Sequence, residues 1–362
     1  MSADASTEPT KVVRWACFGT GQIAAAMAQQ LARMPDARRE LICSASGKPV
    51  DAVEPERLKL GYARCAASVA ALVADACVDV VYVASANTAH AAHCLAALRA
   101  GKHVLCEKPL TMCFAEAEEL FEEAERRGVL LVDGIFSACL PGFDAIRTAL
   151  PSVGRVTHVE LHKKIRLAIL RSSPIINRRD MGGGIFDGTG SYTCHALCAV
   201  FGAAAVAALT PEDVDVTSTA GPNGEVDWET NATVRVGGTT ARLTHRAADD
   251  LWPSVVRGER GTLEFDLPRL QSLVVNGEAV DVAYAGPPGV TDLPVEAPGG
   301  PHGVHPGLGV EAACVHRAIL AGETRAGTAA LPLDVMRAVA HLMDLIRHKI
   351  PTHLHYRGAA GT

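Results

Sequence analysis

The sequence has little of several features that would mark other kinds of protein. Aromatic residues make up only 4% of the 362 residues, which disfavours a pocket for large flat rings. None of the eleven cysteines forms a C-x-x-C pair, so we expect reduced, mostly buried thiols instead of a disulfide framework or a thiolate zinc site. The longest uncharged apolar run, residues 196–209, is too short to cross a hydrocarbon core of about 30 Å and predicts a buried helix.

An excess of positive charge is also absent. The chain carries 34 Lys and Arg against 40 Asp and Glu, a formal net charge of -6. This balance argues against nucleic acid or a membrane as a partner and favours a small-molecule ligand. Residues 1–10 contain no apolar segment, so they predict a flexible tail without a secretory signal and, by default, a cytoplasmic location. A chain of 362 residues is longer than the chains that usually fold around a single hydrophobic core. We therefore expect two domains.

Residues 11–135 alternate short apolar strands with helical patterns, which predicts crossover units on a parallel sheet. Strands are expected over residues 12–18, 41–45, 79–84, 103–107 and 129–132, and helices over residues 23–34, 69–73, 88–99 and 114–127. This is the pattern of an α/β Rossmann domain with a doubly wound parallel sheet. Its ligand should bind at the carboxyl ends of the strands.

The pattern changes in residues 136–362, where strands follow one another without helices between them. Strands are expected over residues 155–167, 213–219, 230–236, 240–245, 261–265 and 271–275. Such a series predicts an α+β domain with a mainly antiparallel open sheet, which is a candidate to bind the substrate. Residues 285–309 are rich in Pro and Gly and predict a loop. Helices near 310–320 and 332–346 follow, and these are candidates to pack back on the first domain.

The first predicted strand leads into Gly19-Thr20-Gly21-Gln22-Ile23-Ala24, a G-x-G-x-x-A run at the start of a helix. Its first Gly permits a tight turn, its second lets a pyrophosphate approach the positive helix end, and Ala24 permits close packing of helix on strand. The run therefore predicts a dinucleotide site. The alternative is a tight turn that holds no ligand.

The end of the second strand indicates which dinucleotide is bound. NAD-binding domains place an Asp or Glu there to accept from the ribose 2′-hydroxyl, and this sequence has neither. Ser44, Ser46 and Lys48 stand there instead, and hydroxyl donors with a cation suit the additional phosphate of NADP. We therefore favour NADP(H), with NAD(H) as the alternative if Lys48 is an ordinary loop lysine.

A lysine follows the strand expected over residues 103–107. Pro109 fixes its own φ and favours an extended Lys108, so the ammonium should leave the sheet at the edge where the cofactor is expected. The Glu107–Lys108 pair is unusual after so apolar a strand. Lys108 is thus a candidate catalytic residue, the alternative being a solvated surface charge.

These motifs together resemble the glucose-fructose oxidoreductase/inositol dehydrogenase/MocA family. The resemblance rests on residues 19–24, on Ala86-Asn87-Thr88-Ala89-His90, on residues 100–110 and on the Gly-rich start of a helix at Gly182. It implies that Ala86, Asn87, His90 and Glu107 border the cofactor and that Lys108 is catalytic. Within the family the sequence is similar to the dihydrodiol dehydrogenase and D-xylose dehydrogenase branch.

The same branch has a catalytic tyrosine at the start of the helix that follows the Gly-rich turn, and Tyr192 matches it. Asp187 lies five residues before Tyr192 where the branch has four, so its role as a catalytic or substrate-binding group is open. His195 is the alternative acid-base group, although a core histidine is the simpler interpretation. Lys163, Lys164 and Arg166 lie on a strand near the expected substrate face.

The residues and the resemblance together predict an NADP(H)-dependent oxidoreductase that acts on a CH–OH or C=O group of a sugar, polyol or trans-dihydrodiol. The alternative is a non-catalytic, dinucleotide-binding regulator that binds a protein partner. No metal is expected, because the paired histidines lack a Cys or carboxylate to complete a ligand set. The resemblance implies a homodimer through the open sheet, whose outer face would otherwise leave apolar side chains in water.

Overall fold

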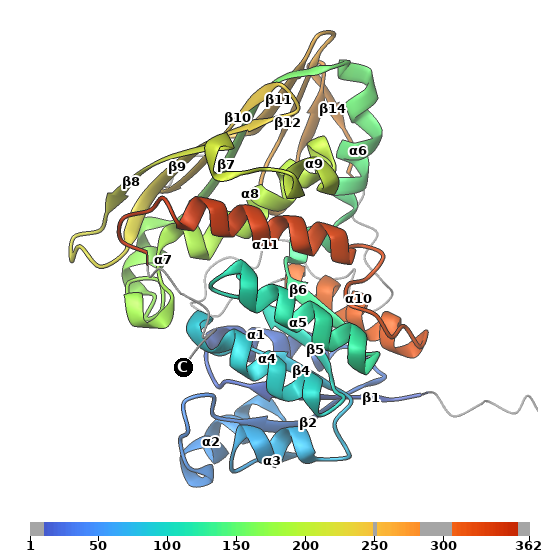
Figure 1. Cartoon of the computed structure of the whole chain (residues 1–362). Coiled ribbons are helices and arrows are strands. Elements are labelled where there is room, and N and C mark those ends of the chain that lie inside the picture. Colours follow the sequence, from blue (N-terminus) through green and yellow to red (C-terminus); the bar gives the residue numbers. More distant parts are fainter. Residues whose placement is uncertain (1–10, 249–251, 283–305, 354–362) are drawn as a thin grey trace, which may run out of the picture.

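A computed structural model describes residues 11–248, 252–282 and 306–353, so the tail expected over residues 1–10 lies outside the described part. Two lobes, each built on one sheet, make up the molecule (Figure 1). No helix of the described residues is both long enough and apolar enough to span a membrane. All eleven cysteines are free thiols, and most of them are buried.

The first sheet is entirely parallel and has the strand order β3-β2-β1-β4-β5-β6. Its strands are β1 (Val13–Phe18), β2 (Ala37–Cys43), β3 (Arg64–Cys65), β4 (Val80–Val83), β5 (His103–Glu107) and β6 (Leu131–Gly134). The helices between them are α1 (Gln22–Leu31), α2 (Val50–Leu60), α3 (Val69–Ala74), α4 (His90–Arg99) and α5 (Phe114–Arg127), with a 3-10 turn, η1 (Asn87–Ala89), before α4. This order confirms the doubly wound Rossmann fold and brings the carboxyl ends of β1, β4 and β5 side by side.

The second sheet has eight strands in the order β14-β13-β12-β11-β7-β10-β9-β8, and only β7 and β10 pair in parallel. Its strands are β7 (Val156–Ile165), β8 (Val214–Ala220), β9 (Asp227–Val236), β10 (Thr239–Ala247), β11 (Ser254–Gly258), β12 (Thr262–Phe265), β13 (Leu273–Val275) and β14 (Glu278–Val280). The mainly antiparallel sheet is as predicted, although the register of its long-range pairs is visible only in the structure.

The remaining helices join and cover the sheets. They are α6 (Pro141–Val153), α7 (Leu167–Ser172), α8 (Ile185–Phe201), α9 (Ala203–Ala207), α10 (Pro306–Leu320) and α11 (Leu333–Arg347), with short turns η2 (Phe136–Cys139), η3 (Arg179–Met181) and η4 (Pro211–Asp213). Helix α8 packs on β7, β9 and β10, and α11 lies between α8 and α9 on one side and α5 on the other (Figure 1). Helix α10 contacts α1, β1 and β5, so both C-terminal helices touch the first domain.

Two expectations from the sequence need correction. The apolar run 196–209 does not form one helix, because Gly202 with φ +85° ends α8 and a separate short helix, α9, follows. The loop expected over residues 285–309 falls mostly outside the described residues, and its described part, from Pro306, already belongs to α10.

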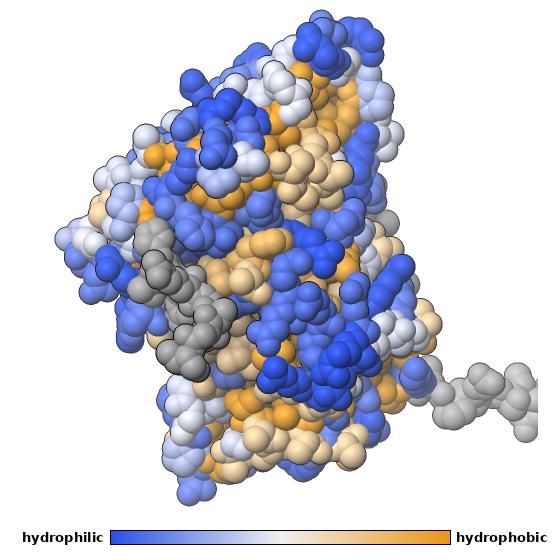
Figure 2. Space-filling view, in the orientation of Figure 1, coloured by the Kyte–Doolittle hydropathy of each residue, from blue (hydrophilic) through white to orange (hydrophobic). Residues whose placement is uncertain are grey.

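The open face of the second sheet is polar along β7, β9 and β10. Along β7 the buried Val159 and Leu161 point toward α8, while His158 and Glu160 alternate with them on the other face. The outward positions of β9 and β10 carry Thr233, Arg235 and Arg242. Figure 2, in the orientation of Figure 1, shows the opposite, helix-bearing side of this sheet, where apolar residues lie among polar ones. The apolar face that motivated the homodimer is therefore not found in these strands, and the dimer stays a prediction.

A buried ion network fastens the end of α11 to the start of α8. Arg347 Nε donates to Asp187 Oδ1 at 2.7 Å, and His353 forms ion pairs with Asp187 at 3.3 Å and Asp227 at 3.1 Å. Burial acts to lower the pKa of His353, but the two carboxylates outweigh it and raise the pKa above its ordinary value. His353 therefore holds its charge more tightly in the folded chain than in the unfolded one.

The network predicts a pH-dependent loss of stability. Below the ordinary histidine pKa of about 6.5, His353 contributes its full stabilisation, and this contribution is lost as the pH rises through the higher folded-state pKa. We expect the stability difference between wild type and His353→Gln to be largest near pH 6 and to shrink by pH 9, measured by urea unfolding at each pH. A difference in stability that grows as the pH rises would contradict the raised pKa of His353.

Candidate active site

The turn after β1 is shaped for a phosphate group. Gly19 has φ +125°, and a Cβ there would lie 2.5 Å from the carbonyl oxygen of Ala84, so only glycine fits. Gly21 is the N-cap of α1, has no side chain to cap it, and faces open space where its Cβ would be. The first N–H groups of α1 are therefore free to bind an anion, which fits a dinucleotide pyrophosphate. Thr20 and Ile23 are half-buried beside this turn, and Gln22 is exposed.

The end of β2 offers hydroxyl groups and a cation. Ser44 is buried, and its Oγ lies 3.1 Å from Oγ of Ser46 and accepts from the Ser46 backbone N–H at 3.2 Å. Ser46 and Lys48 are exposed beyond it. No carboxylate follows β2 before α2 begins at Val50, so the group that would select NAD is missing here.

The segment after β4 links the two domains. Ala86 is the N-cap of η1, and the Asn87 side chain donates to the carbonyl of Gly182 at 2.8 Å across the domain boundary. His90 is fully buried, with Nδ1 2.8 Å from the carbonyl oxygen of Pro109 and Nε2 3.3 Å from that of Ser85. Burial lowers its pKa to about 4. His90 is thus held inside the protein, where it fixes the two chain segments that flank the expected cofactor position.

Lys108 extends from the carboxyl end of β5 toward the second domain. Its Nζ donates to the carbonyl of Gly188 in α8 at 3.1 Å. Glu107, directly before it, is buried and accepts from the Tyr82 hydroxyl at 2.5 Å. Burial raises the pKa of Glu107, although Lys108 and Tyr82 act to lower it. The position of Lys108 is therefore set by the strand below it and by the start of α8 above it.

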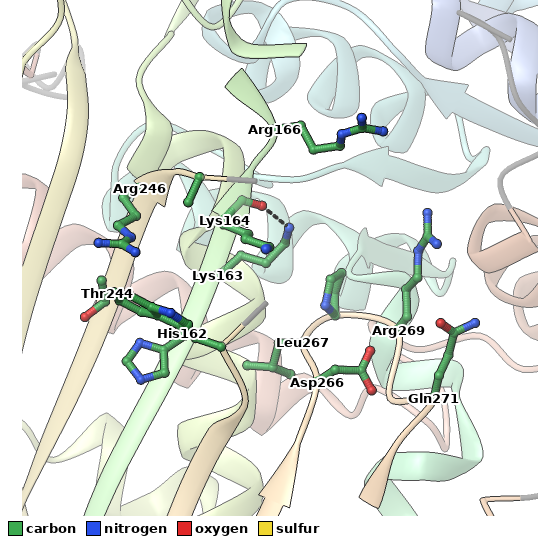
Figure 3. A pocket seen from close by; sticks show the side chains of 13 residues that line it. His162, Lys163, Lys164, Arg166, Thr244, Arg246, Asp266, Leu267, Arg269 and Gln271 are labelled. Atoms are coloured by element: carbon green, nitrogen blue, oxygen red, sulfur yellow. Dashed lines mark hydrogen bonds between the residues drawn. The ribbon is translucent and has the colours of Figure 1, made fainter. Parts of the chain in front are cut away.

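Two ammonium groups flank the ring of Tyr192. Nζ of Lys108 lies 5.6 Å from the ring centroid and Nζ of Lys163, from β7, lies 5.9 Å from it. Tyr192 is 5% exposed, and its hydroxyl makes no hydrogen bond to any residue that the structure describes. Burial, and after it the neighbouring cations, first Lys108, lower the pKa of Lys163 to about 7. Lys163 also lines a pocket, where its Nζ donates to the Lys164 carbonyl at 2.6 Å (Figure 3). The phenol of Tyr192 and the amines of Lys108 and Lys163 therefore lie close together.

Three buried carboxyl groups lie close enough to raise the pKa of Tyr192. Burial has the largest effect, and Glu107, Glu311 and Asp133 add to it, so the hydroxyl stays protonated. Burial, then Glu107, raises the pKa of Asp133 itself to about 7. Both oxygens of Glu311 are buried without a hydrogen-bond partner in the described part of the chain. The analysis of the sequence missed Asp133 and Glu311, although a carboxylate directly after a strand and one inside the apolar run 310–313 were visible signals.

Asp187 and His195 lie elsewhere. The Asp187 side chain is fully buried and committed to Arg347 and His353, so it braces α8 instead of facing Lys108. His195 is 2% exposed and packs edge-on against Phe143 with ring centroids 4.4 Å apart. Burial lowers the pKa of His195 to about 3, so it is a neutral core residue. Within the described ranges, no three His, Cys, Asp or Glu side chains are grouped to hold a metal ion.

Comparison with known proteins identifies the class of protein. Residues 13–134 match the GFO_IDH_MocA family, described as an oxidoreductase family with an NAD-binding Rossmann fold. The resemblance that the sequence motifs indicate is thus confirmed. Residues 13–134 thus form a domain that matches this family's NAD-binding Rossmann fold, and the protein is an oxidoreductase of the dehydrogenase and reductase kind.

Several relatives resemble most of the chain. Scyllo-inositol 2-dehydrogenase (NADP(+)) of Bacillus subtilis is 27% identical over 70% of this chain and 76% of its own. Trans-1,2-dihydrobenzene-1,2-diol dehydrogenase of Mus musculus is 27% identical over 74% of this chain and 78% of its own. Among solved structures, levoglucosan dehydrogenase in complex with NADH and levoglucosan has a TM-score of 0.74 at 19% identity, covering 94% of this chain and 97% of that one. At that identity the likeness confirms the fold alone.

The open space at Gly21 leads to a prediction about cofactor binding. A methyl group there meets no protein atom, so Gly21→Ala should fold as stably as wild type, yet it would occupy space in front of the N-terminus of α1. We expect the Kd for NADP(H), measured by fluorescence titration, to rise at least roughly tenfold, about 1.4 kcal/mol, with an unchanged Tm. Gly19→Ala is the contrasting variant and should lower the Tm. Unaltered affinity in Gly21→Ala would place the pyrophosphate elsewhere.

Proposed function

We propose that this protein is an NADP(H)-dependent oxidoreductase that acts on a CH–OH or C=O group of a sugar, polyol or trans-dihydrodiol. The observation that carries the proposal is the convergence of Lys108 and Lys163 on Tyr192, at the same sheet edge as the Gly19–Gly21 turn. The names of the relatives, which act on scyllo-inositol and on a dihydrodiol, support the substrate class.

Tyr192 and Lys108 have complementary roles in this proposal. When bound, the nicotinamide supplies or accepts the hydride. In reduction the carbonyl carbon gains the hydride, and Tyr192 donates its hydroxyl proton to the oxygen, which becomes the product alcohol. Because burial and the nearby carboxyl groups keep the hydroxyl protonated, the resting site suits this direction. Lys108 donates a hydrogen bond to the same oxygen and, with Lys163, stabilises the phenolate that remains.

Support for NADP(H) over NAD(H) comes from the end of β2. The exposed Ser46 and Lys48 match the requirements of a 2′-phosphate, and no carboxylate follows the strand to repel it. The B. subtilis relative is named for NADP(+), whereas levoglucosan dehydrogenase was solved with NADH. The cytoplasmic location and the homodimer expected from the sequence stay predictions.

Replacement of the lysine tests the enzymatic proposal. Lys108→Met should reduce kcat by roughly 10²- to 10⁴-fold, because the hydrogen bond to the reacting oxygen is lost, and should leave the NADPH Kd within about threefold of wild type. Lys102→Met is the matched control at the other end of β5, directly before the strand begins, since Lys102 Nζ donates to the Asp75 and Val78 carbonyls instead. The measurement is NADPH oxidation or NADP reduction with a panel of pentoses, hexoses, polyols and vicinal diols.

Two outcomes of that panel would contradict the proposal. Equal losses of turnover and NADPH affinity in Lys108→Met would make the lysine structural. Tight NADPH binding by wild type with no turnover of any substrate would favour the alternative, a dinucleotide-binding regulator with a protein partner.

A charge reversal tests the cofactor preference. Lys48→Glu removes a cation and adds a carboxylate that repels a 2′-phosphate. We expect the ratio of kcat/KM with NADP to kcat/KM with NAD to fall at least roughly tenfold, with the value for NAD changed little. Lys59→Glu, an exposed lysine of α2, serves as the control. A wild-type enzyme that prefers NAD, or an unchanged ratio in Lys48→Glu, would refute the preference.

A further inference from the structure

Two cysteines lie together where the C-terminal part of the chain returns to the first domain. Cys139 ends the turn η2, which follows β6, and Cys314 lies in the middle of α10, which packs on η2. The contact between these segments is close, because a Cβ on Gly307 of α10 would lie 2.2 Å from a ring carbon of Phe136 in η2. Gly307, Glu311 and Cys314 follow at helical spacing, so they share the face of α10 that meets η2.

The two thiols interact and differ in their properties. A hydrogen bond from the Cys139 thiol lowers the pKa of Cys314 against the effect of burial, and Arg317, whose Nη2 donates to Cys314 Sγ at 3.6 Å, lowers it further. The same bond between the thiols, and after it burial, raises the pKa of Cys139. Both side chains are partly exposed. Cys314 therefore supplies the thiolate of the pair, and Cys139 keeps its proton.

Each cysteine stands one turn after a residue that acts on Tyr192. Phe136, on η2 before Cys139, packs edge-on against the Tyr192 ring with ring centroids 5.3 Å apart. Glu311, on α10 before Cys314, is one of the buried carboxyl groups that raise the pKa of Tyr192. A bond between the two cysteines would therefore join the two segments that bring these groups to the ring.

We propose that Cys139 and Cys314 are a modification site, at which a peroxide forms a disulfide that ties η2 to α10 and slows the reaction at Tyr192. The Cys314 thiolate attacks one oxygen of hydrogen peroxide, the O–O bond breaks, and the departing hydroxide takes a proton to form water. Cys314 is then a sulfenic acid. The Cys139 sulfur attacks the Cys314 sulfur and displaces its hydroxyl group, which leaves as water with the Cys139 proton. Two thiols thus lose two electrons, and one peroxide becomes two molecules of water.

The disulfide changes the packing around Tyr192. A covalent bond holds two sulfur atoms closer together than a hydrogen bond does, so η2 and α10 must shift toward each other. Phe136 and Glu311 shift with them, and both act directly on the Tyr192 ring. Formation of the disulfide is independent of the proposed function, whereas its effect on turnover rests on that function.

Peroxide titration tests the site without any substrate. Hydrogen peroxide is added to the reduced protein until Cys77, an exposed cysteine outside the pair, is oxidised, and the peptides are analysed by mass spectrometry. We expect peptides linked through Cys139 and Cys314, which dithiothreitol separates, in wild type and in the control Cys77→Ser at the same peroxide concentration. Cys139→Ser should instead accumulate a sulfenic acid on Cys314 that dimedone traps, because the second thiol is missing.

Two results would overturn the site. One is wild-type protein in which Cys77 is oxidised but Cys139 and Cys314 are not linked. The other is Cys314→Ser in which dimedone labels Cys139 as fast as it labels Cys314 in Cys139→Ser, since Cys314 would then not be the attacking thiol. Tm and NADPH affinity are measured for all the reduced proteins, and comparable values show that the variants fold.

Turnover by the two redox forms tests the effect on Tyr192. We expect oxidation to lower kcat at least roughly tenfold in wild type and in Cys77→Ser, dithiothreitol to restore it, and Cys314→Ser to be insensitive to the same treatment. Equal turnover by reduced and oxidised wild type would refute the effect on the reaction. Linked peptides without turnover by either form would support the modification site and count against the proposed function.

Discussion

Like-charge repulsion around a single buried ring is the constraint on which the site depends. Lys108 and Lys163 hold their ammonium groups within 5.6 and 5.9 Å of the Tyr192 centroid, where low dielectric strengthens the repulsion between them. Free side chains would separate toward water. Here Lys108 is fixed by β5 and by its bond to the Gly188 carbonyl, and Lys163 by a strand paired with β10 and β11. The rigidity of two sheets from two domains therefore keeps the two amines together, although burial and the repulsion lower the pKa of Lys163.

Buried carboxyl groups also act on Tyr192. Glu107, Asp133 and Glu311 are buried, and burial raises the pKa of each. These carboxyl groups favour the protonated phenol, while the two lysines favour the phenolate. The balance between them decides how readily Tyr192 gives up a proton, and it involves α10, a helix that returns from the second domain to contact β5.

The sequence predicts those features that depend on local chemistry. The strand expected over residues 103–107 has the same bounds as β5. The G-x-G-x-x-A turn lies where the sequence predicts it, because the steric need for glycine there is local. Tyr192 was singled out by its match to the catalytic tyrosine of the similar branch, and its role stays a prediction. Asp187 shows the limit: its shifted spacing left its role open, and its partners, Arg347 and His353, lie at least 160 residues away, where no local pattern reveals them. The thiol pair at the contact between η2 and α10 was equally hidden, because only the fold brings these segments together.

The central claim is that Lys108 and Tyr192 act on one oxygen beside the cofactor. A crystal structure of the protein with NADP(H) and a substrate or unreactive analogue tests it most directly. The account predicts a nicotinamide ring at the carboxyl end of β5, with the reacting oxygen of the substrate within about 3 Å of both Tyr192 Oη and Lys108 Nζ. A nicotinamide bound away from Lys108, or a substrate oxygen that reaches neither group, would contradict it.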